Sequence, residues 1–347
     1  MKVIYTEKQR LHHVRFEFLN GEATPCFEKP ERADMVLSAL NNHGGFTMVE
    51  PNSYGDAPLR WVHTDDYVDF LASCWDQWVE AFGDVHDASP YCFAPARHLR
   101  NRIPKDIEGR LGYYSFDMTA AITAGSWKAI VAATECALTG VDLIKQGEHA
   151  AFALCRPPGH HAASDLMGGY CYANNAAIAA ESFIRQGAKR VAVLDIDYHH
   201  GNGTQSIFYH RNDVLFASIH GDPDYDYPHY LGFADEEGEG EGLGFNLNLP
   251  LPLHTTDWSV YEPVLAQALT RIADYKPEAL VISLGMDTFA DDPISYFKLM
   301  RNDYQNIGWM IGLLNIPTLF VFEGGYAVDD LGHNTVAVLD GFNKALV

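Results

Sequence analysis

The sequence is short of the residues that would build a disulfide framework or a cysteine metal site. It has six cysteines in 347 residues, and no two of them form a Cys-x-x-Cys pair. Disulfide scaffolds and cysteine zinc sites depend on regular cysteine spacings, so we expect six separate, reduced thiols. Any metal ion in this protein must therefore be held by histidine and carboxylate side chains.

Positive charge is also scarce. The 24 Lys and Arg residues face 46 Asp and Glu residues, which gives a net charge of −22 with neutral histidines. Direct binding of nucleic acid needs a basic footprint, so no nucleic-acid partner is expected. The negative field would attract a cationic small substrate or a basic peptide. An equally good interpretation of the charge is that it only keeps the protein in solution.

Long apolar runs are missing as well, and none approaches the ~20 residues that a membrane-spanning helix requires. The first residues, Met1 to Tyr5, are typical of a strand rather than of a signal peptide. No repeat, low-complexity tract or Pro/Gly/Ser linker divides the chain. We expect a cytoplasmic protein of one domain, residues 1–347, with no membrane partner.

Short apolar runs with the composition of buried strands recur along the chain, and helix-like stretches such as residues 174–186 and 260–275 lie between several of them. Runs of this kind suit strands that are covered on both faces. The alternation predicts an α/β fold, a mainly parallel sheet with helices on both faces. The runs are residues 3–5, 151–154, 191–194, 214–219, 280–284 and 318–322.

One segment, residues 83–112, breaks this rhythm. It has no clear period and concentrates basic side chains in an acidic protein: Arg97, His98, Arg100, Arg102, Lys105 and Arg110. A loop this long in a compact domain is usually functional or part of an interface, and the alternative is a solvated insertion. A second stretch, residues 235–242, is acidic and is expected to be an exposed loop without an assigned role.

Polar residues of the types that enzymes use for catalysis follow four of the apolar runs. Parallel strands bring their carboxyl ends to one edge of the sheet, so the four groups can converge. One group alone would be a weak indication, but four on one edge are hard to assign to structure alone. They are Arg156-Pro157-Pro158-Gly159-His160-His161, Asp195-Ile196-Asp197-Tyr198-His199-His200-Gly201-Asn202-Gly203, Gly285-Met286-Asp287 and Glu323-Gly324-Gly325-Tyr326.

The spacing of Asp197 and His199 predicts a metal site. On an extended chain the two side chains point to the same side and could hold one ion. With Asp287 they form the three-ligand set that catalytic zinc sites use, which keeps one position open. Two carboxylates offset the charge of the metal more than histidines do, so a general base nearby would help, and His160 and His161 are the candidates.

Two further roles follow from the same motifs. Asp195 and Asn202 are candidates to fix the tautomers of the two imidazoles. Tyr326 follows a double-glycine turn, which would let its phenol reach the site and stabilise a developing oxyanion. Each residue also has a plainer reading: a solvated loop for the histidine pair, a helix N-cap for Asp287 before Thr288, and packing for Tyr326. These readings lose weight when the four groups are taken together.

In this combination the motifs resemble those of the zinc-dependent deacetylases that include histone deacetylases, and within them the bacterial acetylpolyamine amidohydrolases. The motifs occur in the same order along the chain as in that family, and the similarity extends over essentially the whole chain. It implies the arginase/deacetylase α/β fold, with a mainly parallel, eight-stranded sheet. The motifs that carry it are Arg-Pro-Pro-Gly-His-His (156–161), Asp-Ile-Asp-Tyr-His-His-Gly-Asn-Gly-Thr (195–204), Leu-Gly-Met-Asp-Thr (284–288) and Glu-Gly-Gly-Tyr (323–326).

The resemblance also implies a set of metal ions. It assigns zinc to Asp197, His199 and Asp287, and iron(II) or cobalt(II) would suit the same ligands. It further implies a monovalent-cation site, usually potassium, at Asp195, Asp197, His199, Ser218 and Ile219.

For the catalytic residues, the resemblance makes His161 the general base and acid and His160 a mainly protonated electrostatic partner. Asp195 would pair with His160, and Asn202 with His161. An Asn at the second place is the pattern of class II-like relatives and gives His161 a weaker negative partner. Tyr326 would polarise the scissile amide carbonyl.

Aromatic walls for the substrate channel are implied at Tyr170, which follows Gly169, and at Tyr227. Such walls grip a methylene chain by apolar contact and leave its cationic end to find acids. Glu17 stands where the polyamine enzymes place an acidic residue near the channel mouth, and Asp117 would serve likewise.

We therefore expect a zinc amidohydrolase that converts N-acetylated polyamines or small acetylated diamines, of the acetylputrescine, acetylcadaverine or acetylspermidine type, to free amine plus acetate. Residues 83–112 resemble the segment through which the polyamine enzymes dimerise and narrow access, which implies a homodimer. The alternatives are a protein or peptide acetyl-lysine deacetylase with the same mechanism, and a non-catalytic metal-binding module. An arginase-like ureohydrolase would need a second metal site, for which the motifs offer no complete ligand set.

Overall fold

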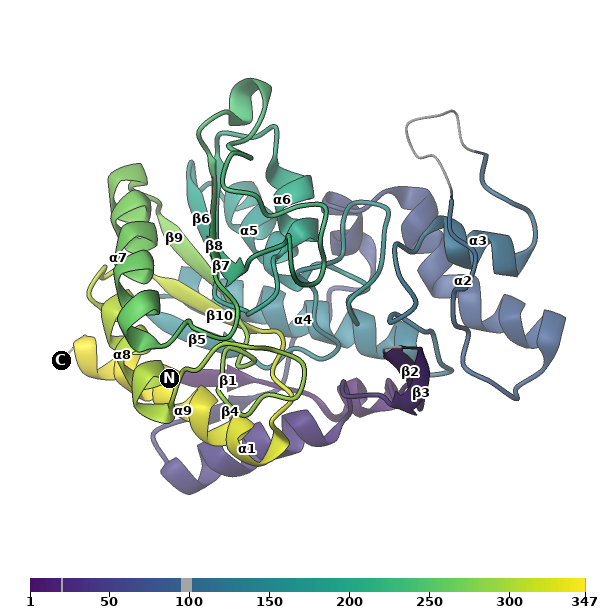
Figure 1. Ribbon diagram of the computed structural model, residues 1–347, viewed down its shortest axis with the longest axis horizontal. Coiled ribbons are helices and arrows are strands. Elements are labelled where there is room, and N and C mark those ends of the chain that lie inside the picture. Colours follow the sequence, from purple (N-terminus) through teal and green to yellow (C-terminus); the bar gives the residue numbers. More distant parts are fainter. Residues whose placement is uncertain (20, 95–101, 347) are drawn as a thin grey trace.

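An eight-stranded sheet in the order β4-β1-β5-β10-β9-β6-β7-β8 is the centre of the computed structural model, which describes residues 1–19, 21–94 and 102–346 (Figure 1). The pairings between the described strands of this sheet are all parallel, so the predicted fold class is confirmed. The strands are β1 (Lys2–Ile4), β4 (Thr47–Val49), β5 (Ala150–Ala153), β6 (Val191–Asp195), β7 (Val214–Gly221), β8 (Asn246–Leu251), β9 (Ala279–Leu284) and β10 (Thr318–Phe322).

The six apolar runs correspond to β1, β5, β6, β7, β9 and β10, whereas β4 and β8 were not anticipated. Those two strands form the edges of the sheet, where a strand has one neighbour and needs no continuous apolar run. The residues of β4 are exposed or half-buried, and β8 mixes asparagine with leucine. A separate antiparallel hairpin, β2 (Phe16–Leu19) and β3 (Glu22–Pro25), was not anticipated either.

Helices cover both faces of the sheet, as expected. One apolar cluster joins α2, α3, α4 and α5 to side chains such as Ala151 and Val193, and the other joins α1, α7, α8 and α9 to Phe152 and Leu194. Among the described residues, no helix combines the length and apolar character that crossing a membrane would need. The bounds are α1 (Glu31–His43), α2 (Asp65–Phe82), α3 (Ile107–Tyr113), α4 (Ser126–Lys145), α5 (Asn175–Arg185), α6 (Asn202–Phe208), α7 (Trp258–Tyr275), α8 (Arg301–Gly312) and α9 (Val328–Ala345), with 3-10 turns at Glu7–Leu11, Ala57–Trp61 and Gly240–Gly242.

The segment 83–112 is not irregular throughout, which corrects the expectation from its sequence. Its last part forms most of α3, whose N-cap Asp106 accepts hydrogen bonds from the N–H groups of Glu108 and Gly109. Arg110 turns back onto α2, where it donates to Gln77 over 2.6 Å and lies over the ring of Phe70. The predicted basic residues Arg97, His98 and Arg100 lie outside the described part of the chain.

The acidic stretch 235–242 is mostly exposed, as expected, but one of its residues has a structural role. Glu236 accepts hydrogen bonds from the Gln205 side chain (2.7 Å) and from the N–H of Gly232 (2.8 Å). The stretch is therefore fixed to α6 through Gln205.

Candidate active site

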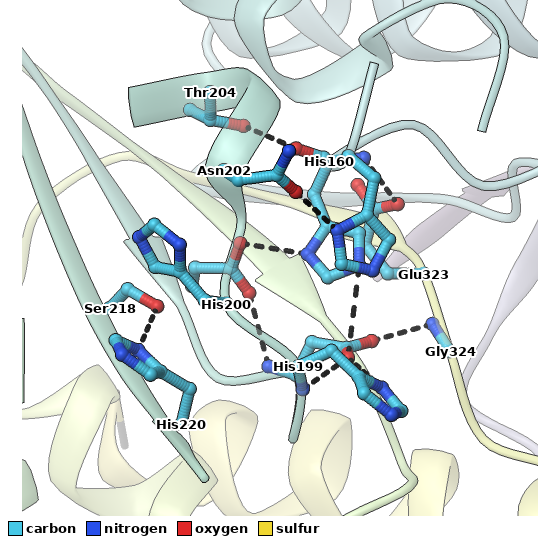
Figure 2. A network of polar contacts seen from close by, with 12 residues as sticks. His160, His199, His200, Asn202, Thr204, Ser218, His220, Glu323 and Gly324 are labelled. Atoms are coloured by element: carbon cyan, nitrogen blue, oxygen red, sulfur yellow. Dashed lines mark hydrogen bonds and ion pairs between the residues drawn. The ribbon is translucent and has the colours of Figure 1, made fainter. Parts of the chain in front are cut away.

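The loops after β5, β10, β9 and β6 lie side by side at the carboxyl edge of the sheet, because these four strands are neighbours in that order. They carry the four polar motifs of the sequence, residues 156–161, 323–326, 285–287 and 195–203. Figure 2 shows His160, His199, Asn202, Glu323 and Gly324 from these loops in one polar network.

Asp197, His199 and Asp287 form a buried group whose potential ligand atoms all lie within 4.8 Å of one another. His199 Nδ1 is 2.9 Å from an oxygen of Asp287 and 3.4 Å from an oxygen of Asp197. Burial, and then the adjacent Asp197 carboxylate, raise the pKa of Asp287 to about 8. Two buried carboxylates this close need a proton or a cation between them, so this oxygen and nitrogen donor set fits a divalent metal ion.

Backbone N–H groups hold these carboxylates in place. The N–H of Gly324 donates to Asp197 Oδ2 and the N–H of Tyr198 donates to Asp287 Oδ1, both over 2.8 Å. A Cβ atom at position 324 would lie 2.6 Å from the Asp197 oxygen and 2.7 Å from an Asp287 oxygen. The double-glycine turn after β10 therefore has a second role, because only glycine lets the backbone come this close to the acids.

A second group of potential ligands, His160, Cys171 and Glu323, also lies within 4.8 Å in the described part of the chain. Burial raises the pKa of the Cys171 thiol well above its usual range and that of Glu323 to about 8. Metal ligands must be deprotonated, so this group is a poor metal site. Glu323 instead accepts hydrogen bonds from the N–H groups of Gly159 (2.6 Å) and His160 (3.2 Å), which fixes the histidine loop.

His160 and His161 are neighbours with different partners. The Nδ1 atom of His160 lies 3.0 Å from Asp195 Oδ2, and that of His161 lies 2.6 Å from Asn202 Oδ1. Burial disfavours the charged form of His160, but the carboxylates of Asp197 and Asp195 outweigh it and raise the pKa of His160 to about 10. For His161, burial and then the His160 charge lower the pKa well below its usual value. The pair thus divides into a cation and a neutral imidazole.

The neutral imidazole has its tautomer set by its partner. An amide oxygen can only accept, so the Asn202 contact places the proton of His161 on Nδ1 and leaves Nε2 as an acceptor. The loop itself is held from α6, since the N–H groups of Gly203 and Thr204 both donate to the carbonyl of His160 over 3.1 Å.

Tyr326 lines the same cavity as His161 and His199. Tyr326 is 7% exposed, and burial raises the pKa of its phenol well above the usual value. The phenol is therefore protonated at neutral pH and can donate a hydrogen bond. The Arg32 guanidinium lies 4.8 Å from the ring centroid of Tyr326 and donates to the carbonyl of Gly325 over 2.7 Å. Nothing in the sequence pointed to Arg32, which lies on α1.

A cavity of about 250 Å³ opens onto these residues. Gly169 and Tyr170 both have left-handed backbone conformations, with φ of +54° and +63°, at the point where the chain passes His161. The lining of the cavity contains the predicted wall residues but neither Glu17 nor Asp117. The lining residues are Leu19, Thr119, His161, Gly169, Tyr170, His199, Asp226, Tyr227, Pro293, Ile294, Tyr296 and Tyr326.

The structure places the two acids, expected at the channel mouth, behind its walls. Glu17 is 4% exposed, hydrogen-bonds with the side chain of Tyr170 and accepts the N–H of Phe27 over 3.2 Å. One oxygen of Asp117 accepts from the hydroxyl of Tyr227 (2.5 Å) and from the N–H of Gly169 (3.0 Å). These carboxylates therefore support the two aromatic walls and do not line the cavity.

Asp226 does line the cavity, although no sequence motif pointed to it. It accepts from the Tyr198 hydroxyl over 2.5 Å and from the N–H of Tyr227 over 2.8 Å, contacts that hold it in place. Its position directly before the aromatic wall residue Tyr227 was the only signal the sequence offered.

The residues expected to hold a monovalent cation lie beside this site, where β6 and β7 run in register. Asp195 is the partner of Ser218 in that pairing, and Ile219 is the next residue. The five expected residues, Asp195, Asp197, His199, Ser218 and Ile219, are all buried. The Ser218 hydroxyl is 2.8 Å from Nδ1 of His220 (Figure 2). His200, which stands next to His199 in the sequence, packs against His220 with 4.5 Å between ring centroids and is not part of the metal-ligand group.

Known proteins resemble this chain over nearly its whole length. The family model for the histone deacetylase domain, which describes sequences of that family, matches residues 26–342 of this chain. The chain is 53% identical to acetylpolyamine amidohydrolase 2 of Pseudomonas aeruginosa over 342 residues, which are 99% of this chain and 98% of that one. It is 46% identical to the acetylpolyamine amidohydrolase of Mycoplana ramosa over 341 residues, which are 98% and 99% of the two chains.

A solved structure is similar over the same extent. The crystal structure of an acetylpolyamine aminohydrolase from Burkholderia pseudomallei superposes with a TM-score of 0.94 at 38% identity, and the match covers 99% of both chains. The family model covers residues 26–342 and the relatives match nearly the whole chain, so the chain belongs to the histone deacetylase family.

Proposed function

We propose that this protein is a metal-dependent amidohydrolase that removes the acetyl group from N-acetylated polyamines or small acetylated diamines. The observation that carries the proposal is the pair of adjacent histidines with different partners, Asp195 for His160 and Asn202 for His161, beside the Asp197, His199 and Asp287 group. His161, His199 and Tyr326 line one cavity. The names of the similar bacterial enzymes support acetylated polyamines as the substrate class.

The neutral imidazole of His161 would act as the general base. Its Nε2 atom takes a proton from the water that attacks the amide carbon, and it returns a proton to the nitrogen when the C–N bond breaks. The products are acetate and the free amine. His160 keeps its proton throughout, because Asp195 and Asp197 hold it charged, and it stabilises the negative charge that builds up in the site.

Tyr326 would donate a hydrogen bond to the carbonyl oxygen of the amide as that oxygen becomes negative. The divalent ion would be held by Asp197, His199 and Asp287, and when bound it supplies Lewis-acid polarisation of the carbonyl and of the attacking water. Zinc is the ion we propose, and iron(II) or cobalt(II) suit the same donors. Potassium at Asp195, Asp197, His199, Ser218 and Ile219 is proposed as a structural ion.

For the substrate, we propose that Tyr170 and Tyr227 flank the acyl-amine chain and that Gly169, which packs closely against His161, lines the channel beside it. The negative net charge and the cavity carboxylate Asp226 favour an amine that is cationic at its far end. We also propose one cytoplasmic domain of residues 1–347, assembled as a homodimer in which residues 83–112 restrict access.

The test is a substrate comparison with the zinc-reconstituted protein: acetylcadaverine against an acetyl-lysine peptide. We expect a higher kcat/KM for acetylcadaverine, and a peptide preference would make the protein a peptide deacetylase instead. A metal-loaded protein that hydrolyses no acetylated amine would be a binding module.

A second measurement tests the role of the phenol. Tyr326→Phe should lower kcat by about 100-fold or more, with the fold and the metal content unchanged, because it removes one donor to the oxyanion. Tyr225→Phe is the matched control, since Tyr225 is 74% exposed and does not line the cavity. Turnover near that of the wild type in Tyr326→Phe would exclude the proposed role.

A further inference from the structure

Asp292 is a buried carboxylate in the loop after β9, five residues beyond Asp287, and it is 7% exposed. Its Oδ2 atom accepts the N–H of Tyr326 over 2.7 Å and the N–H of Ala327 over 3.3 Å. Its Oδ1 atom accepts the N–H of Ile294 over 3.1 Å. One side chain thus binds the backbone of two loops, and Tyr326 lies 34 positions further along the chain.

The turn between β10 and α9 needs such an acceptor. The first N–H groups of a helix have no partner inside the helix, and Ala327, the N-cap of α9, offers no side-chain cap. A carboxylate is well placed there, because the N-terminus of a helix carries partial positive charge. Asp292 supplies it from a different loop.

Each residue of the turn 324–326 is held by a different side chain. Gly324 is held through its N–H by Asp197, and Gly325 is held through its carbonyl by Arg32. The backbone N–H of Tyr326 itself is held by Asp292. The direction in which the phenol leaves the backbone therefore depends on this carboxylate more directly than on the other two contacts.

The other end of the Asp292 contact reaches the substrate cavity. Pro293 and Ile294 line the cavity, as does Tyr326, and the Oδ1 contact fixes Ile294 relative to the turn. Asp292 therefore sets the spacing between the wall of the cavity and the phenol.

We propose that Asp292 is a positioning residue for the hydrolysis: it fixes the backbone of Tyr326, so that the phenol lies where the amide oxygen becomes negative. The inference rests on the proposed function and adds to it a residue outside the motifs. A hydrogen bond to a developing oxyanion depends on geometry, and a misplacement of about 1 Å can cost about 100-fold in rate.

The experiment is a double-mutant cycle between Asp292 and Tyr326, with kcat and KM measured on acetylcadaverine. Asp292→Asn should lower kcat by about 10-fold or more in the wild-type background, with the metal content and KM little changed, because the phenol is misplaced. In the Tyr326→Phe background the same substitution should change kcat by less than about twofold, since the group being positioned is gone.

A purely structural role gives a different result. If Asp292 only stabilises α9, Asp292→Asn lowers kcat by the same factor in both backgrounds, and that result overturns the proposal. So does wild-type kcat in Asp292→Asn. Glu135→Gln is the matched control, because Glu135 is 4% exposed, accepts the N–H of Tyr54 over 3.1 Å and lies outside the cavity lining. It should lower the melting temperature and leave kcat unchanged.

Asp292→Glu is the second variant if Asp292→Asn does not fold, since it keeps the charge and moves the carboxylate by one methylene. It should show the same loss of kcat and the same absence of effect in the Tyr326→Phe background. A wild-type protein that hydrolyses no acetylated amine would overturn the proposed function, and this inference with it. An active wild type with an unchanged Asp292→Asn would overturn this inference alone.

Discussion

The sharpest test of the site geometry is Gly169→Ala. Gly169 has φ of +54°, and a Cβ atom there would lie 2.3 Å from Cδ2 of His161, 2.9 Å from its Cγ and 2.8 Å from the hydroxyl oxygen of Tyr227. Carbon atoms pack at about 3.5–4.0 Å, so the imidazole would have to move by about 1 Å or more. The 2.6 Å contact between His161 and Asn202 opposes that movement.

The size of the effect follows from this displacement. Moving the general base by about 1 Å should cost about 100-fold in kcat/KM, which is about 2.7 kcal/mol of transition-state stabilisation. Stability should fall too, because an L-residue in the left-handed region costs about 1–2 kcal/mol. These two costs have separate causes and can be measured separately.

The assay is kcat/KM on acetylcadaverine beside thermal unfolding. Gly240→Ala is the matched control, because Gly240 has φ of +61° and a Cβ atom there would meet no other atom within 4 Å. It should share the loss of stability and keep its activity. Wild-type kcat/KM in Gly169→Ala, or an equal loss of activity in Gly240→Ala, would refute the reasoning.

Two other predictions concern charge. Asp226→Asn should raise KM for acetylputrescine about fivefold, which corresponds to the value of about 1 kcal/mol expected for a partly exposed ion pair, and it should leave KM for neutral N-butylacetamide unchanged. The control Glu17→Gln should not alter this selectivity. Equal KM changes for both substrates in Asp226→Asn would contradict the role of its charge. His63 accepts the N–H of Asn174 at Nε2 (2.9 Å) and contacts the carbonyl of Ala163 at Nδ1 (2.8 Å), and burial lowers its pKa to about 4. Because the unfolded chain then binds this proton more readily, the contribution of His63 to stability is complete above about pH 6.5 and falls as the pH drops towards 4, by about 2 kcal/mol at about pH 5. Urea unfolding at about pH 7 and about pH 5 should show a smaller acid-side loss in His63→Gln than in the wild type, and an equal loss would contradict the assignment.

The parts of the site that the sequence predicted share one property: each lies in a motif that begins where an apolar run ends. His161, Asp197, Asp287 and Tyr326 are placed by the ends of buried strands, so local pattern and fold position agree. Their spacing in the sequence was enough to bring them together.

The parts that the sequence placed differently or missed depend on contacts between distant segments or on an inverted pattern. In the β2 strand, Phe16 and Phe18 are 62% and 55% exposed and Glu17 between them is 4% exposed, so the usual alternation is reversed. A reading that follows hydrophobicity places Glu17 towards solvent, whereas the structure turns it to Tyr170. Asp292 offered no signal either, because its partner Tyr326 is 34 residues away.

The position of β10 has a consequence for how the site comes into being. This last strand of the sheet in chain order lies between β5 and β9, so without it the strands form two separate groups, β4-β1-β5 and β9-β6-β7-β8. One group carries the histidine loop after β5, and the other carries the metal-ligand residues after β6 and β9. Strand pairings between distant segments form late, and here the final one closes the sheet and delivers Tyr326 in the same step. We therefore expect the proposed site to be complete only once β10 pairs with both of its neighbours.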